Sequence, residues 1–206
     1  MALNTSLITK LREATGAGLN DCKAALDEAG NDVQKAIEIL RKKGAVKAAK
    51  KIAERTTHEG IVDSYIHATG KVGVLIQVGC ETDFVASNAD FRALVHDLAI
   101  QVAGANAQYI RPEDVPAEII EKEKEIYREQ LATEKKPEAM RDKIIEGKLA
   151  KFYQETCLLK QVFIKDDSIT IEQLIEGGIA KLGEKIEVVR FSRFQVWSEH
   201  LPLWPL

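Results

Sequence analysis

The sequence is poor in cysteine, and it lacks both a long apolar run and a large excess of charge. Its three cysteines stand far apart with no CxxC pair, at Cys22, Cys80 and Cys157. Neither a disulfide framework nor a zinc site is indicated, and we expect reduced thiols. No run of about 18 apolar residues occurs, so a membrane-spanning class is a poor fit. Residues 1–5 lack the basic and apolar segments of a secretion signal, and we expect a cytoplasmic protein without a membrane partner.

Motifs of the common enzyme classes are also absent. No Walker loop, GxGxxG, HExxH or GxSxG pattern occurs. The four histidines are scattered, and none stands at nucleophile or metal-ligand spacing to a cysteine. Cys80 has two acidic neighbours, Glu81 and Asp83, which are expected to raise its pKa and make it a poor nucleophile. We therefore expect a protein that is not an enzyme and needs no cofactor or metal.

What is present is the composition of an ordinary globular protein. The chain has 206 residues, of which 45% are hydrophobic and 30% charged, and a net charge of −3. This length suggests one or two domains with a sizeable core. Because no global basic field exists, direct binding to nucleic acid is not expected.

Residues 1–44 predict three short helices that are separated by glycines. Apolar residues recur at helical spacing in three stripes, which begin near Leu3, Leu19 and Val33. A glycine follows each stripe and is expected to end the helix, because glycine reaches positive φ without strain. These glycines are Gly16, Gly30 and Gly44. Asn31 is expected to open the third helix, and the three helices would form a compact bundle like a ubiquitin-associated domain.

The segment 41–55 carries seven basic residues and one acid. A nucleic-acid patch is one interpretation, but no aromatic side chain is interleaved to stack on a base. A solvated linker helix is favoured, with small and apolar residues such as Ala48 and Ile52 on its dry side. We therefore predict two domains, 1–53 and 54–206, and expect the first to fold and detach as a unit.

The segment from residue 60 to 105 predicts a β-hairpin followed by a helix. Strands are expected at 60–67 and 72–78, joined by a turn at 69–71. Alternate residues of the second strand share one apolar face: Val72, Val74, Ile76 and Val78. A helix to about residue 105 then follows, with Ser87 or Asn88 as its cap.

Two charged amphipathic helices come next, at 117–133 and 137–153. A break at Lys135, Lys136 and Pro137 separates them, and a break this short predicts an antiparallel helical hairpin.

The last part of the chain predicts one more helix and a strand. Thr170 and Gln173 form a capping box for a helix that Gly183 ends. Residues 187–196 then return as a strand. The predicted fold is α+β, with the three-helix ubiquitin-associated-like bundle followed by an α/β core domain. That core domain contains a β-hairpin or antiparallel sheet and the helical hairpin.

The octet Gly79–Ala86 lies where the second strand leads into a helix. Its large ring, Phe84, stands between an acid and a β-branched residue. In one interpretation Phe84 is a core residue under a strand–helix turn, and Thr82 or Asp83 caps the helix. In the other, Phe84 is exposed and contacts a partner. Spacing by itself favours the core.

Two blocks resemble the signatures of the elongation factor Ts family. Val78–Asn88 contains a Thr-Asp-Phe-Val run, and Leu11–Leu26 contains a Thr-Gly-Ala-Gly run. A Leu-Leu-x-Gln-x-Phe-x-x-Asp run from Leu158 and a closing strand rich in Phe and Arg extend the resemblance over residues 3–196. The chain is similar to the shorter members, which have one copy of the core unit. The tail 197–206 departs from the family pattern.

The resemblance implies a nucleotide-exchange factor that binds elongation factor Tu in its GDP form. In the family, the Thr-Asp-Phe-Val corner enters the GTPase domain of that partner near its Mg²⁺ and wedges the Phe between two helices, so that GDP leaves. By resemblance, the dislocating residues are Thr82, Asp83, Phe84 and Val85. The bundle would bind a second surface of the GTPase domain around Thr15, Gly16, Ala17, Gly18, Asp21 and Lys23. The C-terminal part would reach another domain of the partner, and short members can form homodimers through the core.

Two other functions stay open. A ubiquitin-associated-like adaptor would bind a peptide or a nascent chain with its N-terminal bundle, but that function leaves the Phe84 corner unexplained. An RNA-binding protein would have only the basic segment 41–55 as its contact surface.

Overall fold

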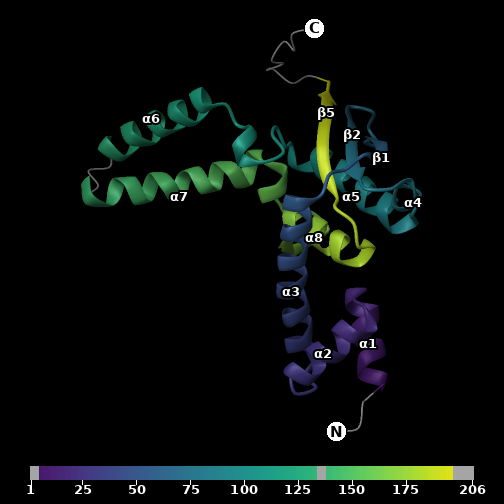
Figure 1. The fold of residues 1–206 in the computed structure, drawn as a ribbon. Helices are drawn as coiled ribbons and strands as arrows, with labels where there is room; N and C mark the ends of the chain where they lie inside the picture. The colour runs from purple at the N-terminus through teal and green to yellow at the C-terminus, as the bar shows by residue number, and fades with distance from the viewer. Residues whose placement is uncertain (1–4, 134–137, 197–206) are drawn as a thin grey trace. The chain divides into compact units, whose positions relative to one another are not determined.

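The computed structural model describes residues 5–133 and 138–196 and shows an α+β fold, as predicted (Figure 1). The predicted helix break at Lys135–Pro137 and the tail 197–206 lie outside the described residues. The chain forms two compact units, each built from several segments. Among the described residues, the first unit draws on 5–61, 77–95 and 173–189, and the second on 62–76, 96–133, 138–172 and 190–196.

The first three helices, in the first unit, form the predicted bundle. They are α1 (Thr5–Thr15), α2 (Leu19–Glu28) and α3 (Val33–Glu54). Their apolar stripes share one core, whose buried members are Ile8, Leu11, Cys22, Ala25, Leu26 and Ala36. Because each helix buries one stripe against the other two, the three-helix prediction is confirmed.

The predicted ends of the third helix were wrong at both sides. Gly16 and Gly30 do have positive φ, +66° and +64°, and end their helices. Gly44, in contrast, lies inside α3, which runs on through the basic segment to Glu54. A glycine costs a helix interior only about 1 kcal/mol relative to alanine, and the Ala and Lys residues around it favour helix. At the other end the cap is Asp32, whose carboxylate accepts the Gln34 and Lys35 N–H groups at 3.0 and 3.1 Å.

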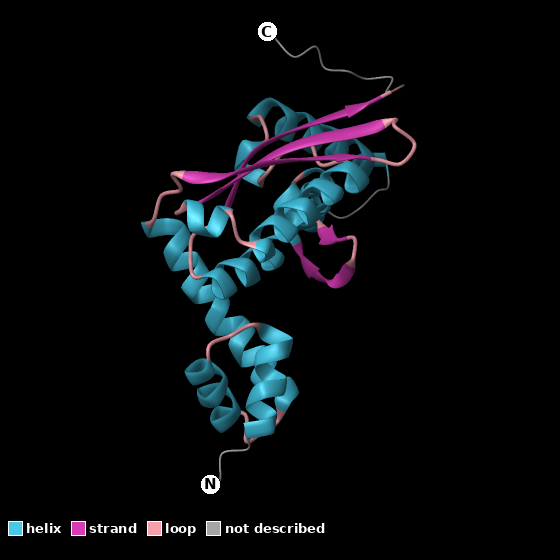
Figure 2. Cartoon of the chain, turned by 90° about the vertical axis from the view of Figure 1, so that its right-hand side faces the viewer, coloured by secondary structure: helices cyan, strands magenta, loops and turns pink. Residues whose placement is uncertain are grey.

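Three strands form one sheet in the order β1-β2-β5 (Figure 2). They are β1 (Glu59–Ile66), β2 (Val72–Cys80) and β5 (Glu187–Gln195). The N–H of Val196 donates to the carbonyl of Lys71 at 2.9 Å, which joins the end of β5 to the start of β2. Val74, Ile76 and Val78 are buried while Leu75 is exposed, so the alternation predicted one face of β2 correctly. The predicted hairpin and closing strand are confirmed.

Two helices, rather than one, follow β2. The first is the four-residue α4 (Asp83–Ala86), and the second is α5 (Ala89–Ala105). Asn88, one of the two predicted caps, accepts the Asp90 N–H at 2.8 Å and begins α5. The stripe predicted for this helix is buried: Phe91, Leu94, Val95, Leu98 and Val102.

The helical hairpin lies in the second unit, where α6 (Ala117–Thr133) and α7 (Glu138–Thr156) run side by side (Figure 1). Leu131 of α6 packs with Ile145 and Leu149 of α7 in a small core. The Lys148 ammonium donates to the Gln130 side chain at 2.6 Å, which sets the antiparallel register. Short 3₁₀ turns at Pro112–Asp114 and Leu158–Lys160 flank the hairpin in sequence. The helical hairpin is confirmed.

A two-stranded hairpin after α7 was not predicted. It consists of β3 (Val162–Phe163) and β4 (Asp166–Thr170), which pair antiparallel and lead into α8 (Ile171–Leu182). Gln101, on α5, is fully buried and donates to the Val162 carbonyl at 3.1 Å while accepting the Ile164 N–H at 2.9 Å. The hairpin therefore depends on a buried amide about 60 residues earlier, which no local sequence pattern reveals.

Candidate functional site

The corner between β2 and α5 carries the residues Thr82, Asp83, Phe84 and Val85. Thr82 is the N-cap of α4, with φ −130° and ψ 157°, and its Oγ1 accepts the Val85 N–H at 3.4 Å. Fixing the first turn of a helix is unfavourable, and a helix of four residues has almost no intrahelical hydrogen bonds to offset that cost. Such a helix is unstable without tertiary support. The conformation of this corner must therefore be held by another part of the chain.

That support comes from Glu184, in the turn after α8. One oxygen of its carboxylate accepts two backbone N–H groups, from Glu81 at 3.1 Å and from Thr82 at 3.0 Å. The hydroxyl of Thr82 donates to the other oxygen at 2.7 Å. The three hydrogen bonds to a charged acceptor fix both the backbone entering α4 and the rotamer of its cap.

A second carboxylate makes the reciprocal contact. Glu81, at the start of the corner, accepts the Lys185 N–H at 2.6 Å and the Arg55 guanidinium at 3.1 Å. Burial acts to raise the pKa of Glu81, but the Lys185 N–H and the Arg55 charge outweigh it, so the pKa lies below its ordinary value. The Lys185 ammonium, in turn, donates to the Arg55 carbonyl at 3.0 Å. Two turns that are distant in sequence thus hold each other through exchanged carboxylates.

Phe84 projects from this fixed corner into solvent. Its side chain is 79% exposed, whereas Val85 and Ala86 beside it are 4% and 7% exposed. The interpretation of Phe84 as a core residue was therefore wrong: Val85 and Ala86 fill the core under the turn. Asp83 is also exposed, in the first turn of α4, where a carboxylate interacts favourably with the helix N-terminus.

The thiol of Cys80 lies under the same corner. It is fully buried and donates to the Thr82 carbonyl at 3.2 Å. Its pKa is raised, as predicted, but the main cause is burial and the next is the Glu184 carboxylate. The predicted causes, Glu81 and Asp83, were not the right ones. Cys22 and Cys157 are also free, buried thiols with raised pKa values, mainly through burial.

The N-terminal candidate residues occupy the loop between α1 and α2 and the first turns of α2. Thr15 donates from its hydroxyl to the Leu11 carbonyl at 2.6 Å, and Gly18 is the N-cap residue of α2. Asp21 is exposed and pairs with Lys47 of α3 at 3.2 Å. The remaining candidates, Gly16, Ala17 and Lys23, are exposed or half-buried. This set falls within nine consecutive residues of the sequence, and much of it faces solvent.

Lys181 of α8 contacts both the loop after α1 and the first turn of α5. Its Cγ is 3.1 Å from the place that a Cβ on Gly16 would occupy, and its ammonium pairs with Asp90 at 2.9 Å. Gly16 therefore serves both a positive φ and the close approach of this side chain.

A stripe of basic residues on α3 spans the distance from the bundle to the corner. It comprises four cations spaced four residues apart, each with a partner: Lys43 with Glu28, Lys47 with Asp21, Lys51 with the Gly183 carbonyl, and Arg55, just past the helix end, with Glu81. Residues four apart lie on one face of a helix, and each turn advances about 5.4 Å. These four of the seven basic residues in segment 41–55 bind within the chain.

Sequence reasoning identified Glu81 only as a neighbour of Cys80, and missed Arg55, Glu184 and Lys185 as parts of the site. Glu184 and Thr82 are 102 residues apart, and an acid after a helix-ending glycine is a common surface pattern. No local sequence signal pointed to these residues, because α4, the short helix that needs an external partner, was itself not predicted.

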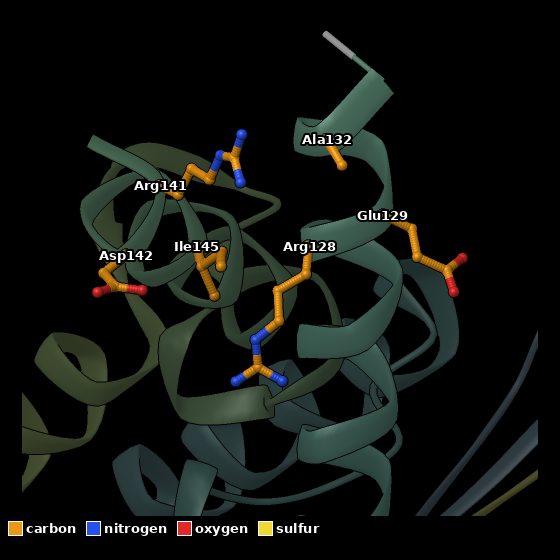
Figure 3. A pocket seen from close by; sticks show the side chains of 6 residues that line it. All are labelled: Arg128, Glu129, Ala132, Arg141, Asp142 and Ile145. Atoms are coloured by element: carbon orange, nitrogen blue, oxygen red, sulfur yellow. The ribbon is translucent and has the colours of Figure 1, made fainter. Parts of the chain in front are cut away.

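The hairpin α6–α7 has a pocket whose lining includes none of these candidate residues (Figure 3). It is lined by Arg128, Glu129, Ala132, Arg141, Asp142 and Ile145. Its two cations and two anions give it no preference for one sign of charge. Within 5–133 and 138–196, no cluster of His, Cys, Asp or Glu is arranged to hold a metal ion. No helix in these ranges is long and apolar enough to cross a membrane.

Comparison with known proteins places the whole described chain in one family. Residues 3–198 match the family described as "Elongation factor TS". The chain is 58% identical over 189 residues to elongation factor Ts of Moorella thermoacetica, covering 92% of this chain and 93% of that protein. It is 54% identical over 196 residues to the factor of Thermotoga maritima, with 95% and 97% covered. The resemblance of the two signature blocks is thereby confirmed, and the chain belongs to the elongation factor Ts family of translation elongation factors.

Proposed function

We propose that this chain is the guanine-nucleotide exchange factor for elongation factor Tu. It binds the GDP form of that GTPase, disturbs its Mg²⁺ site and releases GDP, so that GTP can bind. Membership of the elongation factor Ts family supports elongation factor Tu as the partner. The observation in this chain that carries the proposal is Phe84, a large apolar ring that is 79% exposed on a corner held by two carboxylates.

The corner promotes GDP release by displacing parts of the partner, without any covalent chemistry. A GTPase holds GDP partly through a Mg²⁺ that bridges protein oxygens and the β-phosphate. Phe84 acts as a wedge between two helices of the partner near this metal, and Asp83 accepts a hydrogen bond from a displaced helix. Thr82 and Val85 fix the ring from either side, because one caps α4 and the other is buried beneath it.

The N-terminal bundle supplies a second contact with the partner. Its binding surface is the loop and helix start formed by residues 15–23, of which Gly18, Asp21 and Lys23 are exposed. The C-terminal part reaches another domain of the partner. Separate contacts on one partner allow the bundle to supply affinity while the corner supplies displacement.

Thermodynamic linkage constrains the mechanism. If an exchange protein lowers the affinity of the GTPase for GDP, then GDP must lower the affinity of the GTPase for the exchange protein by the same ratio. A coupling of about 3 kcal/mol corresponds to roughly 150-fold in both directions. The factor therefore accelerates exchange both ways, and the nucleotide in excess determines which one remains bound.

The two alternative functions have less support in the structure. The adaptor leaves the exposed Phe84 without a role. The RNA-binding function depends on segment 41–55, in which four of the seven cations already bind groups of the chain itself.

The test is stopped-flow release of a fluorescent GDP from purified elongation factor Tu. We expect the chain to accelerate GDP release in a saturable manner. Excess unlabelled GDP should lower the affinity of the chain for elongation factor Tu by the same ratio by which the chain lowers the affinity for GDP. An unchanged release rate at saturating chain would refute the proposed function. Lysate pull-down with immobilised chain separates the alternatives, since an adaptor or RNA-binding protein would capture other partners.

A homodimer through the core domain is a further part of the proposal. The β1–β2 hairpin exposes apolar side chains opposite its buried face, at Val62, Ile66 and Leu75. Sedimentation velocity over a range of concentrations tests it. A dimer should dissociate when Leu75 is changed to Glu, whereas a mass that stays monomeric at all concentrations would exclude it.

A further inference from the structure

We propose that Glu184 is a positioning residue for nucleotide exchange, which holds the Phe84 corner in the conformation that acts on the partner. This inference rests on the proposed function. Glu184 lies 100 residues after Phe84 in the sequence, and only the fold brings its carboxylate to the corner.

The carboxylate bonds donors at the start of α4 that have no partner within the helix. The first N–H groups of a helix lack intrahelical partners, and the residues entering α4 have none either. Glu184 accepts from the N–H groups of Glu81 and Thr82 at 3.1 and 3.0 Å. By accepting the Thr82 hydroxyl proton at 2.7 Å, it also directs the lone pairs of that oxygen toward the Val85 N–H.

The position of Glu184 is itself well determined. Gly183, before it, has φ +81° and ends α8. The Gly183 carbonyl accepts the Lys51 ammonium at 2.6 Å, and the Lys185 N–H donates to Glu81 at 2.6 Å. The turn is thus attached on both sides of Glu184, to α3 and to the corner.

The consequence for Phe84 follows from its exposure. An exposed ring gains little from its own surroundings, so its direction is set by the backbone of α4. Without Glu184, the four-residue helix loses its cap geometry, and the ring samples several directions. A wedge must enter a partner in one direction, so the loss falls mainly on the maximal rate of displacement rather than on the initial binding through the bundle.

Three variants separate positioning from general stability. Glu184→Ala removes all three hydrogen bonds. Glu184→Gln keeps the two bonds from the backbone N–H groups through its carbonyl and reverses the third, because its amide donates to Thr82 Oγ1, which still has a lone pair for the Val85 N–H. Thr82→Val removes only the hydroxyl and serves as a second variant if Glu184→Ala does not fold. Glu172→Ala is the matched control, because this residue of α8 has only an exposed ion pair with Lys160 at 2.8 Å.

For Glu184→Ala we expect the maximal rate of GDP release to fall by about ten-fold or more, with less than about a three-fold change in the concentration needed for half-saturation. Glu184→Gln should stay within about three-fold of the parent rate, and Thr82→Val should lie between them. Glu172→Ala should match the parent. Hydrogen exchange measured on the free proteins should show faster exchange at the Thr82 and Val85 amides in Glu184→Ala than in Glu184→Gln.

A double mutant decides whether Glu184 acts through Phe84. If it does, Glu184→Ala should lower the rate no further when Phe84 is already Ala, because residues that act as one unit are not additive. An equal further loss in the double mutant would overturn the inference, as would a parent rate for both Glu184→Ala and Thr82→Val while Phe84→Ala is slow. A parent rate for Phe84→Ala would refute the wedge role of Phe84, whereas a parent chain that does not accelerate GDP release would refute the proposed function itself.

Discussion

Truncating the exposed ring, Phe84→Ala, should damage exchange and leave folding almost unchanged. Only about a fifth of the Phe84 side chain is covered, because 79% of it is exposed. Complete burial of a Phe contributes about 1.5–3 kcal/mol, so the covered part contributes about 0.3–0.6 kcal/mol. Alanine is also the better helix former, by about 0.5 kcal/mol. The free energy of unfolding should therefore change by no more than about 0.5 kcal/mol.

Phe91 provides the internal comparison. It lies seven residues later in α5 and is 0% exposed. Phe91→Ala leaves a cavity and should cost about 3–5 kcal/mol of stability. The two substitutions are chemically identical, so chemical denaturation of both proteins measures the difference in environment directly.

The main effect of Phe84→Ala should be slower release of GDP from the partner. A central aromatic anchor contributes about 2–4 kcal/mol at a protein interface. If this energy acts in displacing the nucleotide, GDP release at saturating factor should slow by about 30-fold to about 700-fold, at 1.4 kcal/mol for each factor of ten. Stopped-flow release of a fluorescent GDP from elongation factor Tu measures this rate.

Two results would refute the reasoning. The first is a variant that is destabilised as strongly as Phe91→Ala, which would mean that the ring is buried in solution. The second is a stable variant that still releases GDP at the parent rate, which would remove the wedge. Asp83→Ala should act in the same direction more weakly, and a non-additive double mutant would indicate that both residues displace one element.

Three further results are expected. Glu81→Gln should lower the melting temperature at pH 7, and the difference from the parent should vanish as the pH falls. The charged Glu81 stabilises the fold fully above its ordinary pKa of 4.5, and this stabilisation is lost as the pH falls through the lower pKa of the folded state. Cys80 and the other two thiols should react with iodoacetamide far more slowly in the native protein than in denaturant at pH 8, because burial raises their pKa values and blocks access. Removing residues 1–53 should weaken binding to elongation factor Tu but leave a core domain with a cooperative, though lower, melting transition. Loss of that cooperative transition would refute the division into 1–53 and 54–206.

Most elements of the fold could be predicted because their signals are local. The alternation in β2 gave its buried face, and the spacing of Phe91, Val95 and Leu98 gave α5. The prediction that a glycine ends a helix was correct at Gly16 and Gly30, where the backbone has positive φ. At Gly44 the same rule failed, since glycine permits positive φ but does not require it, and the helix-forming residues on both sides of it carried α3 onward.

The sequence by itself identified the family, because each of the two signature blocks is an uninterrupted run in the chain, and it predicted the segment that we propose to act on the partner. It could not determine whether Phe84 is buried, since the same spacing fits a ring in the core and a ring in solvent. Only the tertiary structure decided this, by placing Val85 and Ala86 under the turn and leaving Phe84 outside. It also decided what holds the corner, because the Glu184 carboxylate comes from a turn 102 residues beyond Thr82. Hydrogen bonds at that separation depend on the path of the whole chain, and local propensity contains no information about them.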